Sequence, residues 1–244
     1  MTPEIPYKRK AVDPIECIKA GWEMVKPNYW LFVAMAFIAY VIGQAVPVIL
    51  MGPMLCGFYL SLFTSRRREP IEFATLFKGF DYFGPSIVAT LLHAIPIAVI
   101  VIPTYLLFYA SMFFAMSQAQ SEGGAAVLAV FSTFTIVMVV IFVVIIIVSV
   151  AFTFAYPLIV DRKLQGFDAV KLSFRAAMAN FWRLLAMGLL TGVMAMLGMV
   201  VCYVGMFLVF PISYGAIASA YEQVFGLAHA QEASNLPPPP PTFE

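Results

Sequence analysis

The chain has 244 residues, of which 62% are hydrophobic and 11% are charged, and its mean hydropathy is +0.93. Soluble domains are about half apolar and a quarter charged, so this composition excludes an ordinary soluble protein and predicts an integral membrane protein. A net charge of +1 gives no indication of a nucleic-acid partner, and the three cysteines show neither metal-ligand nor Cys-x-x-Cys spacing.

The first segment predicts a flexible basic arm and then a helix lying on the membrane surface. Residues 1–12 are polar and basic, which is not the pattern of a cleavable signal peptide. Asp13-Pro14-Ile15-Glu16 is typical of a helix start, with an acidic cap and proline at the first helical position. The uncharged run 29–65 exceeds what one crossing of a roughly 30 Å hydrocarbon core needs, so it predicts two crossings, at 29–45 and 48–65.

The middle segment repeats this pattern in weaker form. Glu69-Pro70-Ile71-Glu72 resembles the helix start at Asp13, and an aromatic stripe follows it. The apolar run 85–116 predicts one kinked crossing, because it contains two prolines. Residues 117–124 form a polar stretch that predicts a loop, and 125–160 predicts a second helix, since a backbone in lipid must satisfy its own hydrogen bonds.

The third segment starts at Asp161 and predicts an amphipathic helix that leads into the membrane. Crossings are expected at about 184–200 and 204–222. The tail, 226–244, contains a run of prolines that favours disorder or an extended polyproline II rod.

These segments predict an all-α polytopic membrane protein with about six transmembrane helices in three hairpin units, each preceded by a cytoplasmic amphipathic interfacial helix. The units are 13–65, 69–160 and 161–225, within a single membrane domain, 13–225. Internal duplication is the interpretation we favour, although any interfacial helix carries aromatic residues and lysines. All 14 Lys and Arg residues fall on one side of a six-crossing topology, and the positive-inside rule makes that side, with both termini, cytoplasmic.

Candidate functional residues are few, because no Asp, Glu, Lys or Arg falls inside a predicted crossing. The basic clusters predict contacts with lipid headgroups, although topogenic charge alone explains most of them. Three tryptophans are expected as interfacial anchors, one histidine as an intramembrane polar site, and two glycines four residues apart as a helix-packing pair, with internal packing favoured over a dimer interface. The headgroup candidates are Arg66, Arg67, Arg68, Lys78, Arg162, Lys163, Lys171 and Arg175; the anchors are Trp22, Trp30 and Trp182; the polar site is His93, and the glycine pair is Gly188 and Gly192.

The third unit also resembles a family. Its motifs are Pro157-Leu158-Ile159-Val160-Asp161, Gly166-Phe167-Asp168-Ala169-Val170 with Ser173-Phe174, and Asn180-Phe181-Trp182. They are similar to bacterial integral membrane proteins of unknown function that resemble the membrane domain associated with glycerophosphodiester phosphodiesterases. The catalytic domain of those enzymes is absent, so the resemblance implies only a location in the bacterial cytoplasmic (inner) membrane.

No catalytic motif, metal-ligand spacing or cofactor signature is visible, so an enzyme is not expected. The composition and basic cytoplasmic face favour a non-enzymatic interaction or scaffold protein that contacts membrane lipids and protein partners or a second copy. The alternative is a small transporter or channel for an apolar or lipid-like solute, and a histidine-dependent intramembrane enzyme is a distant third.

Overall fold

Secondary structure in the described part of the chain consists of helices and no strands, as predicted. The computed structural model describes residues 5–200 and 204–228, and within these it places every side chain except those of residues 47, 115, 117–127, 129, 200 and 204. The elements are α1 (Pro14–Val25), the 3-10 turn η1 (Lys26–Asn28), α2 (Tyr29–Ala45), α3 (Pro47–Arg66), the 3-10 helix η2 (Phe73–Tyr82), α4 (Phe83–Phe152), α5 (Ala155–Arg162), α6 (Gly166–Ala179), α7 (Phe181–Val200) and α8 (Val204–Phe225).

Several of these helices have the length and composition of membrane spans. Within the described residues, five stretches are long and apolar enough to cross a membrane, against about six expected. They are Pro14–Ala45, Val48–Arg66, Phe73–Phe114, Val130–Arg162 and Phe181–Met199. The protein therefore has the helical architecture of a membrane protein.

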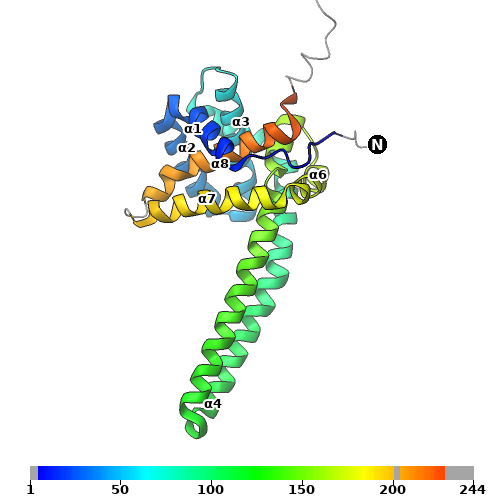
Figure 1. Ribbon diagram of the computed structural model, residues 1–244. Helices are drawn as coiled ribbons and strands as arrows, with labels where there is room; N and C mark the ends of the chain where they lie inside the picture. Colours follow the sequence, from blue (N-terminus) through cyan, green and yellow to red (C-terminus); the bar gives the residue numbers. More distant parts are fainter. Residues whose placement is uncertain (1–4, 201–203, 229–244) are drawn as a thin grey trace, which may run out of the picture.

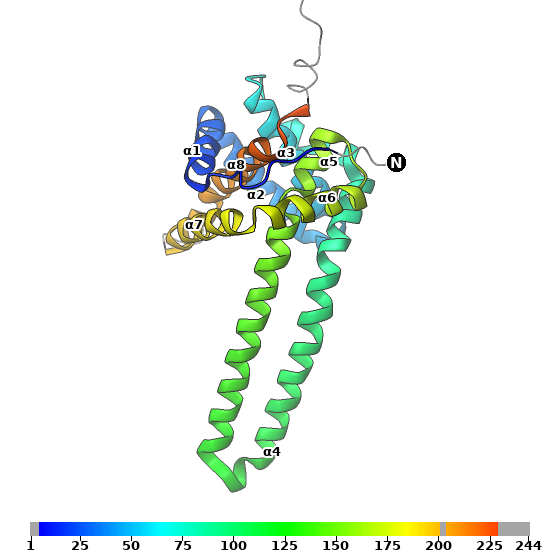
Figure 2. The same cartoon turned by 45° about the vertical axis from the view of Figure 1, so that its right-hand side comes forward.

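Helix α4 folds back on itself and forms a long hairpin. In a straight helix, Phe108 and Phe134 would lie about 39 Å apart, but their ring centroids are 5.3 Å apart. Figures 1 and 2 show the two arms running side by side, away from a body that the other helices form. The backbone is helical through 117–124, and the chain reverses direction in this part of α4, so the predicted turn is present but is not an irregular loop. That stretch contains no proline, and its glutamines and its alanine are good helix formers.

Close backbone contacts hold the body together, and glycines permit them. A Cβ atom added to Gly21 in α1 would lie 2.7 Å from the carbonyl carbon of Gly215 in α8. A Cβ on Gly79 in η2 would lie 2.8 Å from the Cα of Gly57 in α3. These contacts join different predicted units. The pair α1 and α8 joins the first unit to the third, and the pair η2 and α3 joins the second unit to the first.

Aromatic rings fill the centre of the body. Phe58 in α3 packs edge-on against Tyr214 in α8, with ring centroids 5.7 Å apart, and Phe63 lies 5.8 Å from Tyr221. These side chains are buried or partly buried, so α3 and α8 form the aromatic middle of the helical body.

The predicted helix starts have different outcomes. Asp13 caps α1 as expected, because its Oδ1 accepts hydrogen bonds from the amides of Ile15 (3.0 Å) and Glu16 (3.1 Å). The similar signal at Glu69 starts no helix, and η2 begins only after Glu72, whose backbone is extended. The two sequence signals therefore look alike, with an acidic residue before proline, but only the one at Asp13 caps a helix.

The N-terminal arm is held against the body, contrary to the prediction that it is flexible. The amide of Lys8 donates to the carbonyl of Val224 (2.9 Å), and the amide of Ala11 donates to the Asn180 side chain (3.0 Å). Val12 is fully buried. These contacts fix residues 5–12, whereas residues 1–4 and most of the predicted disordered tail, 229–244, lie outside the described residues.

Candidate functional site

A partly buried polar cluster lies where α5 meets the end of α8. The carboxylate of Asp161 accepts hydrogen bonds from the Tyr221 hydroxyl (2.7 Å) and from the amide of Ala228 (3.1 Å). Arg162 forms an ion pair with Asp161 (3.2 Å) and donates to the carbonyls of Phe225 (3.3 Å) and Gly226 (3.0 Å). The last carbonyls of a helix lack intrahelical partners, so Arg162 caps α8. This cluster is a structural element that holds the end of the last helix.

The eight candidate headgroup residues separate into three groups. Arg162 bonds within the polar cluster, with 15% of its side chain exposed, and its headgroup contact stays a prediction. Arg66 pairs with Glu222 (3.0 Å), and Arg67 with Glu69 (3.3 Å), and all four of these residues remain at least partly exposed. The remaining five candidates are exposed at the surface, and they are Arg68, Lys78, Lys163, Lys171 and Arg175.

All three predicted anchors are exposed. Trp22 packs edge-on against Tyr29, with ring centroids 5.3 Å apart. The hydroxyl of Tyr29 donates to the carbonyl of Leu208 in α8 (2.7 Å). Trp30 and Trp182 are about three-quarters exposed. Exposure of large aromatic side chains suits the membrane–water interface, where one ring edge is wet and the other apolar.

His93 lies near the base of the hairpin, in its first arm. Its ring packs edge-on against Phe152 of the second arm, with centroids 4.8 Å apart. Its Nδ1 atom is buried and has no hydrogen-bond partner in the described structure. One turn earlier, Thr90 makes a 3.1 Å hydrogen bond with the Tyr156 hydroxyl. The described contact of His93 with the second arm is therefore made through its ring, and Nδ1 takes no part in a hydrogen bond.

Gly188 and Gly192 do not pack against another helix in the described structure. A Cβ atom added to either glycine would meet no atom within 4 Å. Internal packing by this pair is therefore not observed, because α7 turns these positions outward. Gly21, Gly57, Gly79 and Gly215 make the close helix contacts instead. The parallel between Pro53-x-x-x-Gly57 and Pro211-x-x-x-Gly215 was visible in the sequence and could have pointed to two of them.

Helices α6 and α7 present a long row of exposed apolar side chains. We call this row the apolar floor; its members are each at least half exposed and are Phe167, Phe174, Trp182, Leu189, Val193 and Met196. A spacing of 7 residues within α6, and of 7, 4 and 3 residues within α7, keeps the members of each helix on one face of that helix. The opposite face of α6 is made of buried small residues such as Ala169 and Ser173, and the Ser173 hydroxyl bonds to the backbone at Ala151 (2.8 Å) and Phe154 (3.1 Å).

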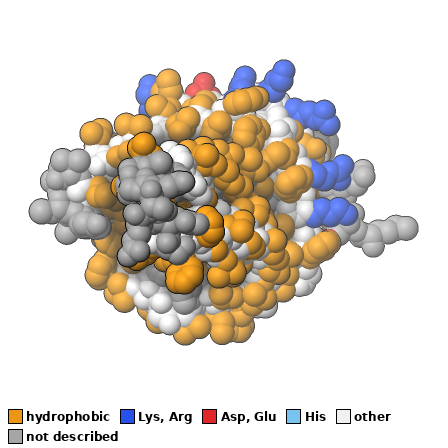
Figure 3. Space-filling view, turned by 90° about the horizontal axis from the view of Figure 1, so that it is seen from below, with side chains coloured by type: hydrophobic (Ala, Val, Ile, Leu, Met, Phe, Trp, Pro, Cys, Tyr) orange, Lys and Arg blue, Asp and Glu red, His pale blue; other side chains and the backbone are white. Residues whose placement is uncertain are grey.

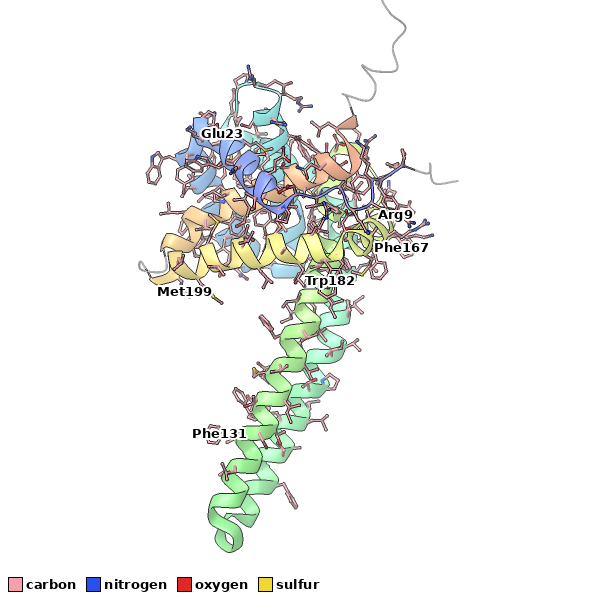
Figure 4. All side chains as sticks on the ribbon, in the orientation of Figure 1. Arg9, Glu23, Phe131, Phe167, Trp182 and Met199 are labelled. Carbon is pink, nitrogen blue, oxygen red and sulfur yellow. The ribbon has the colours of Figure 1, made fainter. Side chains whose placement is uncertain are left out.

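The floor faces the side from which the hairpin projects. Figure 4 shows Trp182 and Met199, near the two ends of α7, both on that side. Seen from below, in Figure 3, hydrophobic side chains cover most of this face, and Lys and Arg side chains lie along its edge. The body therefore has one extended apolar face with a basic margin.

The described polar side chains form no metal-binding group. Among them, no three His, Cys, Asp or Glu residues lie close enough together to hold a metal ion. The buried polar groups of the body, including Asn180 and Ser173, bond to backbone atoms of neighbouring segments. What the arrangement can do chemically is bind apolar and lipid-like surfaces.

Comparisons with known proteins identify no relative. No protein-family profile, no curated protein and no solved structure matches the chain. The resemblance of the third unit to bacterial membrane domains therefore stays an expectation from its motifs.

Proposed function

We propose that this protein is a non-enzymatic interaction or scaffold component of a bacterial cytoplasmic membrane, with both termini in the cytoplasm. It contacts membrane lipids and one or more protein partners, or a second copy of itself, and it requires no cofactor and no nucleic acid. The observation that supports this proposal most strongly is the bare α4 hairpin. In the most apolar stretch of each helix, only 6% of the first hairpin arm and 22% of the second arm are buried inside the protein, whereas 61% of α3 is buried.

The packing near Pro53 also favours this proposal over a transporter. A solute pathway through the kink at Gly52 and Pro53 needs free space beside α3. A Cβ atom added to Gly52 would lie 2.6 Å from the Thr90 hydroxyl and 2.8 Å from the carbonyl of Ser86, both in α4. This close contact leaves no room for a solute at that point.

Native mass spectrometry tests the proposal. The full-length protein is released gently from its own membrane and compared with a chain that ends at Ala228, the last described residue. A stoichiometric protein partner, or a second copy, is the expected result, and its loss on truncation would place the contact in the tail. A monomer that carries one defined lipid or small molecule would overturn the proposal in favour of transport.

A further inference from the structure

The arrangement of α7 and the hairpin restricts how the protein sits in a membrane. Figures 1 and 2 both show α7 running across the direction of the hairpin arms. A helix crosses a bilayer only if it runs roughly along the bilayer normal. The hairpin and α7 therefore cannot both cross the same flat bilayer, although each is long and apolar enough to do so.

The way each element is covered separates the two. The buried share is small in all of them, at 6% for the first arm, 22% for the second arm and 11% for α7, and the exposed apolar side chains of the hairpin arms continue along the part that projects from the body. By contrast, α7 is two-sided: Leu184 and Met187 are buried against the body, and Leu189 and Val193 face outward. A helix that is apolar on one exposed side and packed on the other suits the bilayer surface.

The length of the hairpin independently supports a crossing by the hairpin. Its base is buried up to Thr90, and from Leu91 to Met116 no described side chain of this arm is buried. At about 1.5 Å per residue, this projecting part is roughly 40 Å long. A bilayer with its headgroup regions is about 40–45 Å thick. If the hairpin crosses once in each direction, the underside of the body lies at the near headgroup level.

We infer that the α4 hairpin crosses the bilayer, and that α6 and α7 lie flat on the near leaflet of phospholipid. The apolar floor rests among the outer acyl segments. Lys171 and Arg175 on α6 are exposed beside Phe167 and Phe174, and their long side chains reach the phosphates. This inference goes beyond the proposed function and does not depend on it. Mass spectrometry tests which partners the protein binds, and its outcome does not change the depth of α7 in the bilayer.

Depth measurement by spin labelling tests the inference. Single cysteines replace Leu189, Val193 or Leu197 in the full chain, from which Cys17, Cys56 and Cys202 have been removed, and the labelled protein is placed in vesicles of phosphatidylcholine and phosphatidylglycerol. If α7 lies flat, the three labels share one depth, near the headgroup boundary. If α7 crosses, the first and last labels differ in depth by about 12 Å.

The hairpin provides the matched control. Labels at Val99→Cys and Leu106→Cys, which are equally exposed, should differ in depth by about 10 Å, which shows that the assay resolves a crossing helix. A depth gradient along α7 would overturn the inference, and so would three labels freely reached by a water-soluble relaxation agent.

A second measurement uses the native cysteines and so avoids a folding defect of the cysteine-free chain. A topology reporter is inserted after Met199, near the end of α7. It is expected on the same side as the termini, because α7 does not cross. A reporter on the opposite side at Met199 would show that α7 crosses, and the inference would be wrong.

Discussion

Replacing Gly21 by alanine gives the sharpest test of how the body is packed. The new Cβ atom would lie 2.7 Å from the carbonyl carbon of Gly215 and 3.0 Å from the Cα of Ala216. Unbonded carbon atoms are comfortable at about 3.5–4.0 Å. Both neighbours are backbone atoms of α8, so the two helices must move apart by close to 1 Å, because no side chain can rotate away.

The expected cost follows from two opposing terms. Overpacking of a tight contact costs about 1–3 kcal/mol. Alanine in place of glycine inside a helix returns about 0.5–1 kcal/mol. The net loss therefore lies between about 0 and 2.5 kcal/mol, which for a chain of this size lowers the Tm by up to about 10 °C.

Gly188→Ala is the matched control, because it is also inside a helix and has open space where its Cβ would stand. Alanine at this position gains the same helix stabilisation over glycine, and it meets no neighbouring atom. Its Tm should therefore stay constant or rise by about 1–4 °C. Thermal unfolding of the purified protein in one detergent measures both variants. Equal shifts of the same sign in Gly21→Ala and Gly188→Ala would refute the reasoning.

Three further outcomes are expected. A reporter inserted after Glu122 should be external, since either topology places the hairpin turn there, and a cytoplasmic signal would contradict both. Tyr221→Phe removes a donor from Asp161 and should lower stability by about 1–3 kcal/mol in thermal unfolding, whereas an unchanged Tm would show that the cluster does not hold α8. Asn180→Ala removes the side chain that bonds the N-terminal arm, so trypsin should cut within residues 5–12 faster than in the unmodified protein; equal cutting rates would mean that the arm is held elsewhere.

Helix positions could be predicted well where charge and proline mark the limits. The crossings expected at 29–45 and 48–65 agree with α2 and α3 to within a residue or two, because the flanking residues are charged or polar and a proline follows the turn. The break between α6 and α7 at Asn180 falls just before the expected crossing at 184–200. These limits depend on local chemistry, which a sequence shows directly.

Contacts between helices were much harder to predict. In lipid, apolar helices gain little from hiding apolar surface, so small residues and a few hydrogen bonds decide which helices meet. Gly21 and Gly188 are equivalent by sequence, yet one lies against backbone and the other in open space. Arg162 and Lys163 are adjacent basic residues, but Arg162 caps a helix and Lys163 is exposed, with a left-handed backbone (φ 53°). The members of each pair differ only in the three-dimensional surroundings that the folded chain gives them, and the local sequence does not show these surroundings.

The pairing of α1 with α8 has a consequence for how the protein is made. Gly21 and Gly215 lie near opposite ends of the 244-residue chain. At about 5–20 residues per second, a ribosome needs roughly 10–40 s to extend the chain from one glycine to the other. During that time α1 lacks its partner, and the hairpin, residues 83–152, is completed before Gly215 is made. The hairpin can therefore insert before the body closes, and closure waits for the end of synthesis.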